Sequence, residues 1–132
     1  MTESIGIKKT INLDFGSAIL KVKEAFKANG FGAITEIDIK KTLKEKINAD
    51  FKKYTILGMC NPKTAMDVLD MSDETGLLLP CNVCIYEDKE GNVIVNAVNP
   101  AALLSLAADT DGNLKRKSLE IKKIIEKAVA DI

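Results

Sequence analysis

The fold of this chain is best read from one stretch, Leu77-Leu78-Leu79-Pro80-Cys81-Asn82-Val83-Cys84-Ile85-Tyr86-Glu87. It is the longest apolar run, and it leads directly into the clearest hairpin signal of the chain. An earlier segment, Ile56 to Pro62, has the same character, because each segment places a Cys-Asn pair at one end of an apolar strand beside a proline. If the two strands are neighbours, Cys60 and Cys81 lie close together, and they form a candidate for chemistry.

Composition sets the broad class. At 132 residues, with 46% hydrophobic and 29% charged residues, we expect one globular domain over residues 1–132. Lys+Arg and Asp+Glu balance at 19 each, so no net charge attracts nucleic acid or an anionic membrane. The three cysteines are an odd number and follow no secretory leader, which favours a cytoplasmic protein with free thiols.

The chain contains no histidine, which excludes Ser-His and Cys-His nucleophile pairs within it. Three cysteines without histidine also fall short of a structural zinc set. We therefore expect neither a metal nor a cofactor. No apolar run approaches the roughly 20 residues that a bilayer span needs, so we expect no membrane partner.

Periodicity predicts ten elements. Alternating apolar residues predict strands, and apolar residues three and four apart predict helices. Asp14, Asp38, Asn61 and Asn99 are the expected N-caps, and Gly91 is expected to turn a hairpin. The fold class is α+β, a single mostly antiparallel sheet with helices packed on it in the order βαβαβαββαα. The predicted strands cover residues 5–13, 31–39, 53–60, 77–87 and 93–98, and the helices 15–28, 40–47, 62–71, 100–108 and 114–130.

Cys60 is the first candidate site residue. It ends a strand just before the Asn61 cap and Pro62, where the positive end of the next helix stabilises a thiolate. The alternative is a small apolar residue buried at a strand end. Cys81 and Cys84 spell Cys-x-x-Cys, but residues three apart in a strand face opposite sides, so we expect their sulfurs to diverge. The predicted order of thiol reactivity is Cys60, Cys81, Cys84.

Two further candidates carry charge. Glu36 and Asp38 share one strand face and could do acid–base work. The alternative is structural, with Asp38 capping the next helix and Glu36 paired with a lysine. The lysine-rich segment between Lys40 and Lys53 lacks arginine and interleaved aromatic residues, which favours a solvated helix face over a nucleic-acid surface.

Four blocks of the sequence carry a resemblance to a known family, and they are Leu13-Asp14-Phe15, Thr35-Glu36-Ile37-Asp38, Tyr54-Thr55-Ile56-Leu57-Gly58-Met59-Cys60-Asn61-Pro62 and Leu78-Leu79-Pro80-Cys81-Asn82-Val83. In order and spacing, over nearly the whole chain, they resemble the bacterial and archaeal family catalogued as domain of unknown function 302. The resemblance implies a compact α+β domain, a sheet with helices on one side, and often a homodimer, but it transfers no reaction. Cys84 departs from the family pattern, which usually has an aliphatic residue there. The family motif positions that carry over are Glu36, Asp38, Cys60, Asn61, Pro62, Pro80, Cys81 and Asn82.

Three functional hypotheses follow. The first is a small-molecule or thiol-ligand binding domain, with turnover through Cys60 as a variant; its candidate ligand-binding residues are Cys60, Asn61, Cys81, Asn82, Glu36 and Asp38. The second is a structural or protein-interaction homodimer without chemistry of its own, since five strands leave exposed edges that invite pairing. The third, nucleic-acid binding through the segment from Lys40 to Lys53, is disfavoured by the zero net charge, and we expect no nucleic-acid partner.

Overall fold

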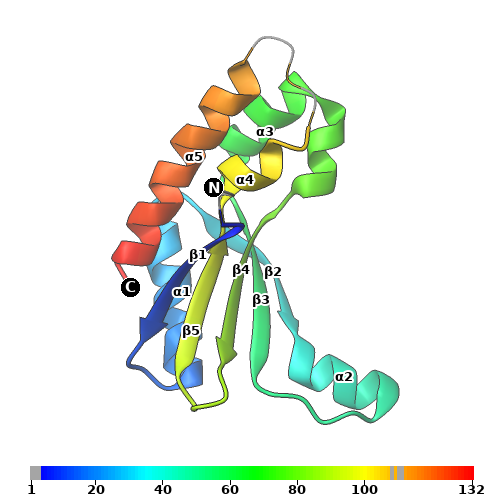
Figure 1. Ribbon diagram of the computed structural model, residues 1–132, viewed down its shortest axis with the longest axis vertical. Helices are drawn as coiled ribbons and strands as arrows, with labels where there is room; N and C mark the ends of the chain where they lie inside the picture. Colours follow the sequence, from blue (N-terminus) through cyan, green and yellow to red (C-terminus); the bar gives the residue numbers. More distant parts are fainter. Residues whose placement is uncertain (1–3, 108, 110–111) are drawn as a thin grey trace.

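The computed structural model describes residues 4–107, 109 and 112–132 (Figure 1). It contains five strands, five α-helices and one 3₁₀ helix among these residues. In chain order they are β1 (Gly6–Ile11), α1 (Phe15–Ala28), β2 (Gly32–Asp38), α2 (Ile39–Ile47), β3 (Tyr54–Cys60), α3 (Pro62–Met71), η1 (Asp73–Leu78), β4 (Cys81–Glu87), β5 (Val93–Val98), α4 (Pro100–Leu104) and α5 (Asn113–Ala130).

The five strands form one antiparallel sheet in the order β1-β5-β4-β3-β2. This confirms the α+β prediction, and every strand pair in the sheet is antiparallel. The hairpin between β4 and β5 turns at Gly91, whose φ of +83° is the left-handed conformation that glycine adopts without a steric penalty. β3 and β4 are hydrogen-bonded neighbours in which Met59 pairs with Cys81, so the two Cys-Asn segments do lie side by side.

One face of the sheet holds the core. Along β4 the side chains of Cys81, Val83 and Ile85 are buried together, and on β3 those of Leu57 and Met59 join them. Because side chains alternate along a strand, these odd-numbered residues share a face. α1 contacts β4 and β5 on this side, and α5 contacts β1 and β5.

The opposite face carries the even-numbered residues of β1, β3, β4 and β5 and the odd-numbered residues at the end of β2. No described helix lies over its centre in Figure 1. We call it the open sheet face. Tyr54 and Tyr86 stack on it with ring centroids 5.2 Å apart, and the Lys52 Nζ lies 5.0 Å from the centroid of the Tyr86 ring. The alternation and the strand register assign to this face Lys8, Thr10, Thr35, Ile37, Tyr54, Ile56, Asn82, Cys84, Tyr86, Ile94 and Asn96.

The predicted helix caps are all confirmed. The Ser17 N–H donates to Asp14 Oδ1 at 2.9 Å, and the Lys41 N–H donates to Asp38 Oδ1 at 3.0 Å. The Asn61 and Asn99 side chains do the same for α3 and α4, each followed by a proline at the first helical position. Each cap satisfies a helix N–H group that has no partner inside the helix, so the starts of these helices are encoded locally.

Some predicted boundaries were wrong, and two apolar helix residues that their spacing would place inward, Met66 and Ile47, are exposed. Residues 77 and 78 belong to η1 rather than to β4, because the Thr75 hydroxyl bonds to the Val68 and Ser72 carbonyls and stabilises a tight turn there. α3 buries Val68, whereas Met66 is 53% exposed. Ile47 is 69% exposed, since α2 projects beyond the sheet and contacts mainly its neighbours β2 and β3.

The second strand and the fourth helix also differ from prediction. A bulge between Ala33 and Thr35 shifts the register of β2, so these two residues do not share a face, although simple alternation over 31–39 would place them together. α4 ends at Leu104 rather than at 108, a position outside the described residues. Across the residues that the structure describes, no helix combines the length and the apolar composition of a membrane span.

Candidate functional site

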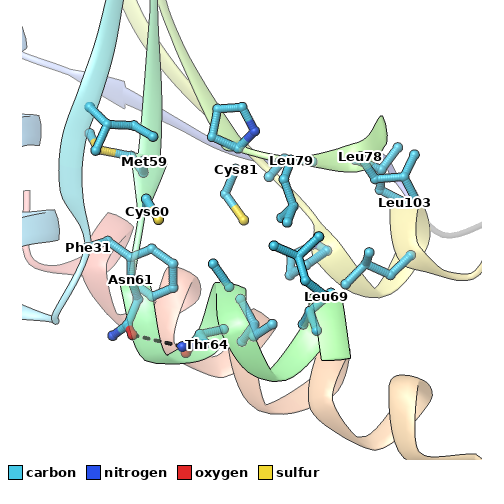
Figure 2. Close-up of a pocket in the computed structure, with 18 residues that line it drawn as sticks. Phe31, Met59, Cys60, Asn61, Thr64, Leu69, Leu78, Leu79, Cys81 and Leu103 are labelled. Carbon is cyan, nitrogen blue, oxygen red and sulfur yellow. Dashed lines mark hydrogen bonds between the residues drawn. The ribbon is translucent and has the colours of Figure 1, made fainter. Parts of the chain in front are cut away.

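A cavity of about 310 Å³ lies beyond one end of the sheet, where β3 ends and β4 begins (Figure 2). α3, η1, α4 and α5 supply most of the rest of its wall, and Phe31, Ile34 of β2 and Val98 of β5 complete it. We call it the strand-end cavity, and it is lined by Phe31, Ile34, Met59, Cys60, Asn61, Thr64, Ala65, Val68, Leu69, Leu78, Leu79, Pro80, Cys81, Val98, Pro100, Leu103, Leu104 and Ile121.

Cys60 and Cys81 both reach this cavity, although strand alternation alone would separate them. Cys60 is the last residue of β3 and Cys81 the first of β4, so their side chains lie at the rim of the sheet. Past the strand ends the sheet no longer separates its two faces, so side chains from either face reach the space below α3. Figure 2 shows both thiols directed toward this space, one on each side. The predicted proximity of the two cysteines is therefore present at the cavity wall.

The wall is electrically neutral. None of the described lining residues carries a formal charge, and only Asn61 and Thr64 bring polar groups other than thiols. Cys81 is 9% exposed. Burial, followed by the charge that Cys60 can carry, raises the pKa of the Cys81 thiol to about 11. Cys81 is thus a neutral thiol at neutral pH, while Cys60 is only partly buried.

Asn61 shapes the cavity through the helix that it caps. Its Oδ1 accepts a hydrogen bond from the Thr64 N–H at 3.1 Å, drawn as a dashed line in Figure 2. With Pro62 at the first helical position, this bond fixes where α3 starts relative to Cys60. One acceptor of the Asn61 amide is therefore used by the fold, and the residue acts first as a positioning group.

Gly58 allows the segment before β4 to pack closely against β3. A Cβ atom at this position would overlap both Thr35 Oγ1 and Pro80 Cγ. Only glycine lets Pro80 lie against β3, and Pro80 is the lining residue that leads the chain into Cys81.

Three of the predicted site residues lie elsewhere. Asn82 is exposed on the open sheet face, opposite Gly58. Glu36 forms an ion pair with Lys23 of α1 at 2.5 Å, and Asp38 caps α2. The structure therefore brings together Cys60, Asn61 and Cys81 only, and the two carboxylates have the structural partners that the alternative interpretation gave them.

Cys84 lies on the face opposite to Cys81, as the strand pattern predicted. It is partly exposed on the open sheet face, paired across the strands with Ile56. Burial, and after it hydrogen bonding with Cys84, raises the pKa of Tyr54 to about 12. All three cysteines are free thiols, so the Cys-x-x-Cys spacing forms no local disulfide.

Most of the lining was not predicted from sequence. Phe31, Leu78, Leu103 and Ile121 come from four separate segments and meet only in the folded chain. In sequence Leu69 is an ordinary apolar residue of α3, and only the structure shows that it remains 39% exposed beside the cavity. Such an unfilled apolar position at a helix surface is typical of a ligand-binding wall as well as of a core.

The other hollows in the described surface are more polar. One of about 470 Å³ lies between α4 and the start of α5, with Asp109, Lys115 and Ser118 in its wall. It is larger than the strand-end cavity, but it contains neither a thiol nor an aromatic side chain. We therefore take the strand-end cavity as the candidate site.

Comparisons with known proteins agree with the observed fold. No curated protein matches the chain. A crystal structure titled as an uncharacterized conserved protein DUF302 from Bacillus stearothermophilus superposes with a TM-score of 0.89 at 25% sequence identity, covering 98% of each chain. The family model described as domain of unknown function DUF302 matches residues 7–132. The chain therefore belongs to the DUF302 family.

Proposed function

We propose that this protein binds a small apolar molecule in the strand-end cavity. The observation that carries the proposal is the wall itself, which is carbon and sulfur over nearly all its surface and bears no charge. The volume of about 310 Å³ is within the range of small-molecule pockets.

The driving force is the apolar surface that the empty protein leaves in water. Leu69 is partly exposed at the cavity, and Ile34 at its rim is largely exposed. Covering such surface contributes about 0.8 kcal/mol for each buried methylene group of a ligand. A neutral chain or ring system therefore binds more favourably than a charged one, because no lining residue compensates a buried charge.

A fluorescence titration tests this proposal. The probe is N-phenyl-1-naphthylamine, a neutral aromatic dye that emits strongly in apolar surroundings. We expect saturable binding at one site per chain. The Ala65→Phe variant fills the cavity and should weaken binding at least about tenfold, roughly the loss of 1.4 kcal/mol. Ala65 and Met66 are adjacent on α3, but only Ala65 lines the cavity.

Met66→Phe is therefore the matched control, because it places the same bulky side chain on the exposed side of the same helix. Its affinity for the dye should equal that of the unmodified protein. Equal loss in both variants, or no saturable binding by the unmodified protein, would contradict the proposal.

A second candidate function, a homodimer, is favoured by the open sheet face. Antiparallel sheets that face water usually alternate apolar and polar residues, yet among the described strand residues assigned to this face only Lys8 is charged, and Lys52 just before β3 adds one ammonium group over Tyr86. Five strands about 4.8 Å apart and about 20 Å long give a planar patch of roughly 500 Å². That is less than the roughly 800 Å² per partner of a standard interface, so the affinity should be modest.

Sedimentation equilibrium tests the dimer. We expect association at tens of micromolar, roughly the range that an interface of this size maintains. Ile56→Lys should abolish it by placing a charge at the centre of the face, whereas Met66→Lys on α3 should not. A monomer at all concentrations, or equal loss in both variants, would contradict the proposal.

A further inference from the structure

We propose that Cys60 and Cys81 form a redox pair that exchanges with an apolar disulfide bound in the strand-end cavity. This inference rests on the proposed function, since the cavity must first bind the small molecule. It assigns the ligand a chemical class, namely a neutral disulfide or dithiol on an apolar chain or ring. Both thiols are free, and both line the cavity.

The backbone places the two cysteines within bridging distance. Cys81 is the strand partner of Met59, and Cys60 is the next residue of β3. Directly opposed Cα atoms in an antiparallel pair are about 4.5–5.5 Å apart, and the rise per residue is about 3.4 Å. The Cα atoms of Cys60 and Cys81 are therefore about 6 Å apart, which is within the usual range for a disulfide. Because alternation starts their side chains on opposite faces of the sheet, the bridge also requires the two strand ends to turn toward the cavity.

The neutral wall is suited to this chemistry in particular. No lining residue can act as a general base or hold a charged intermediate, because none is ionisable except the two thiols. Thiol–disulfide exchange needs neither, since one thiolate and one disulfide react directly. The ligand is neutral before and after the exchange, so no charge remains in the cavity.

The exchange proceeds in two steps. The Cys60 thiolate attacks one sulfur of the bound disulfide; that S–S bond breaks, a Cys60–ligand disulfide forms, and the departing sulfur takes up a proton. The Cys81 thiol then loses its proton and attacks Cys60 Sγ. The Cys60–Cys81 disulfide forms, and the second ligand sulfur leaves and takes up that proton. Two electrons have passed from the cysteine pair to the ligand, which is reduced to its thiols, and the reverse reaction oxidises a dithiol.

Burial assigns the order of the two cysteines. Cys60 is the more accessible, so it attacks first, and Cys81 is almost completely covered and resolves. Burial raises the pKa of Cys81 to about 11. Below that value, the rate of the second step should increase about tenfold for each unit by which the pH is raised, because it follows the thiolate fraction of Cys81. The ligand is consequently held covalently on Cys60 for longer at neutral pH. Cys84 takes no part, because it lies on the open sheet face.

The test uses 4,4′-dithiodipyridine, a neutral aromatic disulfide whose released thiopyridone absorbs light. The full chain carries Cys84→Ser, which removes the thiol of the other face. We expect two thiopyridones per protein and a final mass lower by two hydrogens. With Cys81→Ser added, one thiopyridone should be released and the other should stay attached to Cys60. With Cys60→Ser added, release should slow at least tenfold.

Two outcomes overturn the inference. One is an adduct on Cys60 that persists, in the protein that retains both Cys60 and Cys81, even when the pH is raised toward 11, because the second step then does not occur. The other is equal reaction rates for the Cys60→Ser and Cys81→Ser proteins. N-phenyl-1-naphthylamine binding is measured on the same variants. If the dye binds but no exchange occurs, the redox pair alone is refuted. If the unmodified protein does not bind the dye, the proposed function is refuted as well.

Discussion

The two faces of the sheet are built from alternating residues of the same strands, yet only one of them is covered by helices. On β3, Leu57 is 0% exposed beneath the helices, whereas its neighbour Ile56 is only partly covered on the open sheet face. On β4, Cys81 lines the cavity and Cys84 faces outward beside Tyr54. The open sheet face also carries apolar residues such as Ile37 and Ile56 among its polar ones, so the hydrophobicity of a single residue does not distinguish core from surface. The difference arises because α1 and α5 pack on one side only.

The largest expected effect separates the two faces by stability. Leu57→Ala should lower the free energy of unfolding by about 3 kcal/mol, because it removes buried methyl groups and leaves a cavity. Ile56→Ala should cost about 1 kcal/mol, since Ile56 already contacts water. Urea denaturation of both variants at low protein concentration measures the difference. Equal losses would mean that the open sheet face is covered in the isolated chain.

The second effect is the pH dependence that Cys81 gives to stability. Burial raises its pKa from 9.0 to about 11. The folded protein therefore favours the neutral thiol, and this contribution is fully present below pH 9 and is lost as the pH rises toward 11. The loss is at most about 2–3 kcal/mol, given about 1.4 kcal/mol per unit of pKa.

The control for this effect is the cysteine of the other face. Cys81→Ala should flatten the decline in unfolding free energy between pH 9 and 10.5, roughly the accessible range, whereas Cys84→Ala should leave that decline intact. Tyr54, whose pKa is raised from 10.0 to about 12, adds a decline of its own above pH 10. Because Cys84 contributes to the raised pKa of Tyr54, the Cys84→Ala variant loses part of that decline. The two variants are therefore compared between pH 9 and 10, roughly the range in which Tyr54 contributes little. Identical curves would contradict the burial of Cys81.

The third effect compares the two asparagines that follow the cysteines. Asn61→Ala should cost about 1 kcal/mol of stability, because the N–H of Thr64 loses its acceptor at the start of α3. Asn82→Ala should cost less than about 0.5 kcal/mol, since Asn82 is exposed on the open sheet face. Urea denaturation measures both. An equal cost would mean that Asn82 makes a contact comparable to the cap.

Local chemistry explains which parts of the fold could be predicted. Asp14, Asp38 and Asn61 reveal helix starts because a cap involves only residues within three positions. The matched Cys-Asn segments indicated that β3 and β4 are neighbours, and strand alternation separated Cys84 from Cys81. All of these features depend on short-range patterns.

Short-range sequence patterns do not predict the cavity. Phe31, Leu103 and Ile121 converge from distant segments, and no periodicity indicates that their side chains leave space between them. The apolar residues 77–79 were predicted as strand, since an apolar run alone does not distinguish a strand from a 3₁₀ turn followed by Pro80. Asn82 was grouped with Asn61 by its neighbour in sequence, but strand alternation places it on the other face.

The structure also revises the predicted order of thiol reactivity. Cys60 remains first, but Cys81 is more deeply buried than Cys84 and carries a raised pKa. The expected order of alkylation is now Cys60, Cys84, Cys81. Peptide mass mapping after brief treatment of the native protein with iodoacetamide measures this order.

The most direct measurement repeats this alkylation with and without saturating N-phenyl-1-naphthylamine. If the ligand occupies the strand-end cavity, labelling of Cys60 should slow at least about tenfold, because the bound dye covers a thiol that lines the wall. Labelling of Cys84 should not change, since it lies on the opposite face of the sheet. Protection of Cys84 with Cys60 unaffected would place the ligand on the open sheet face and contradict the proposed function.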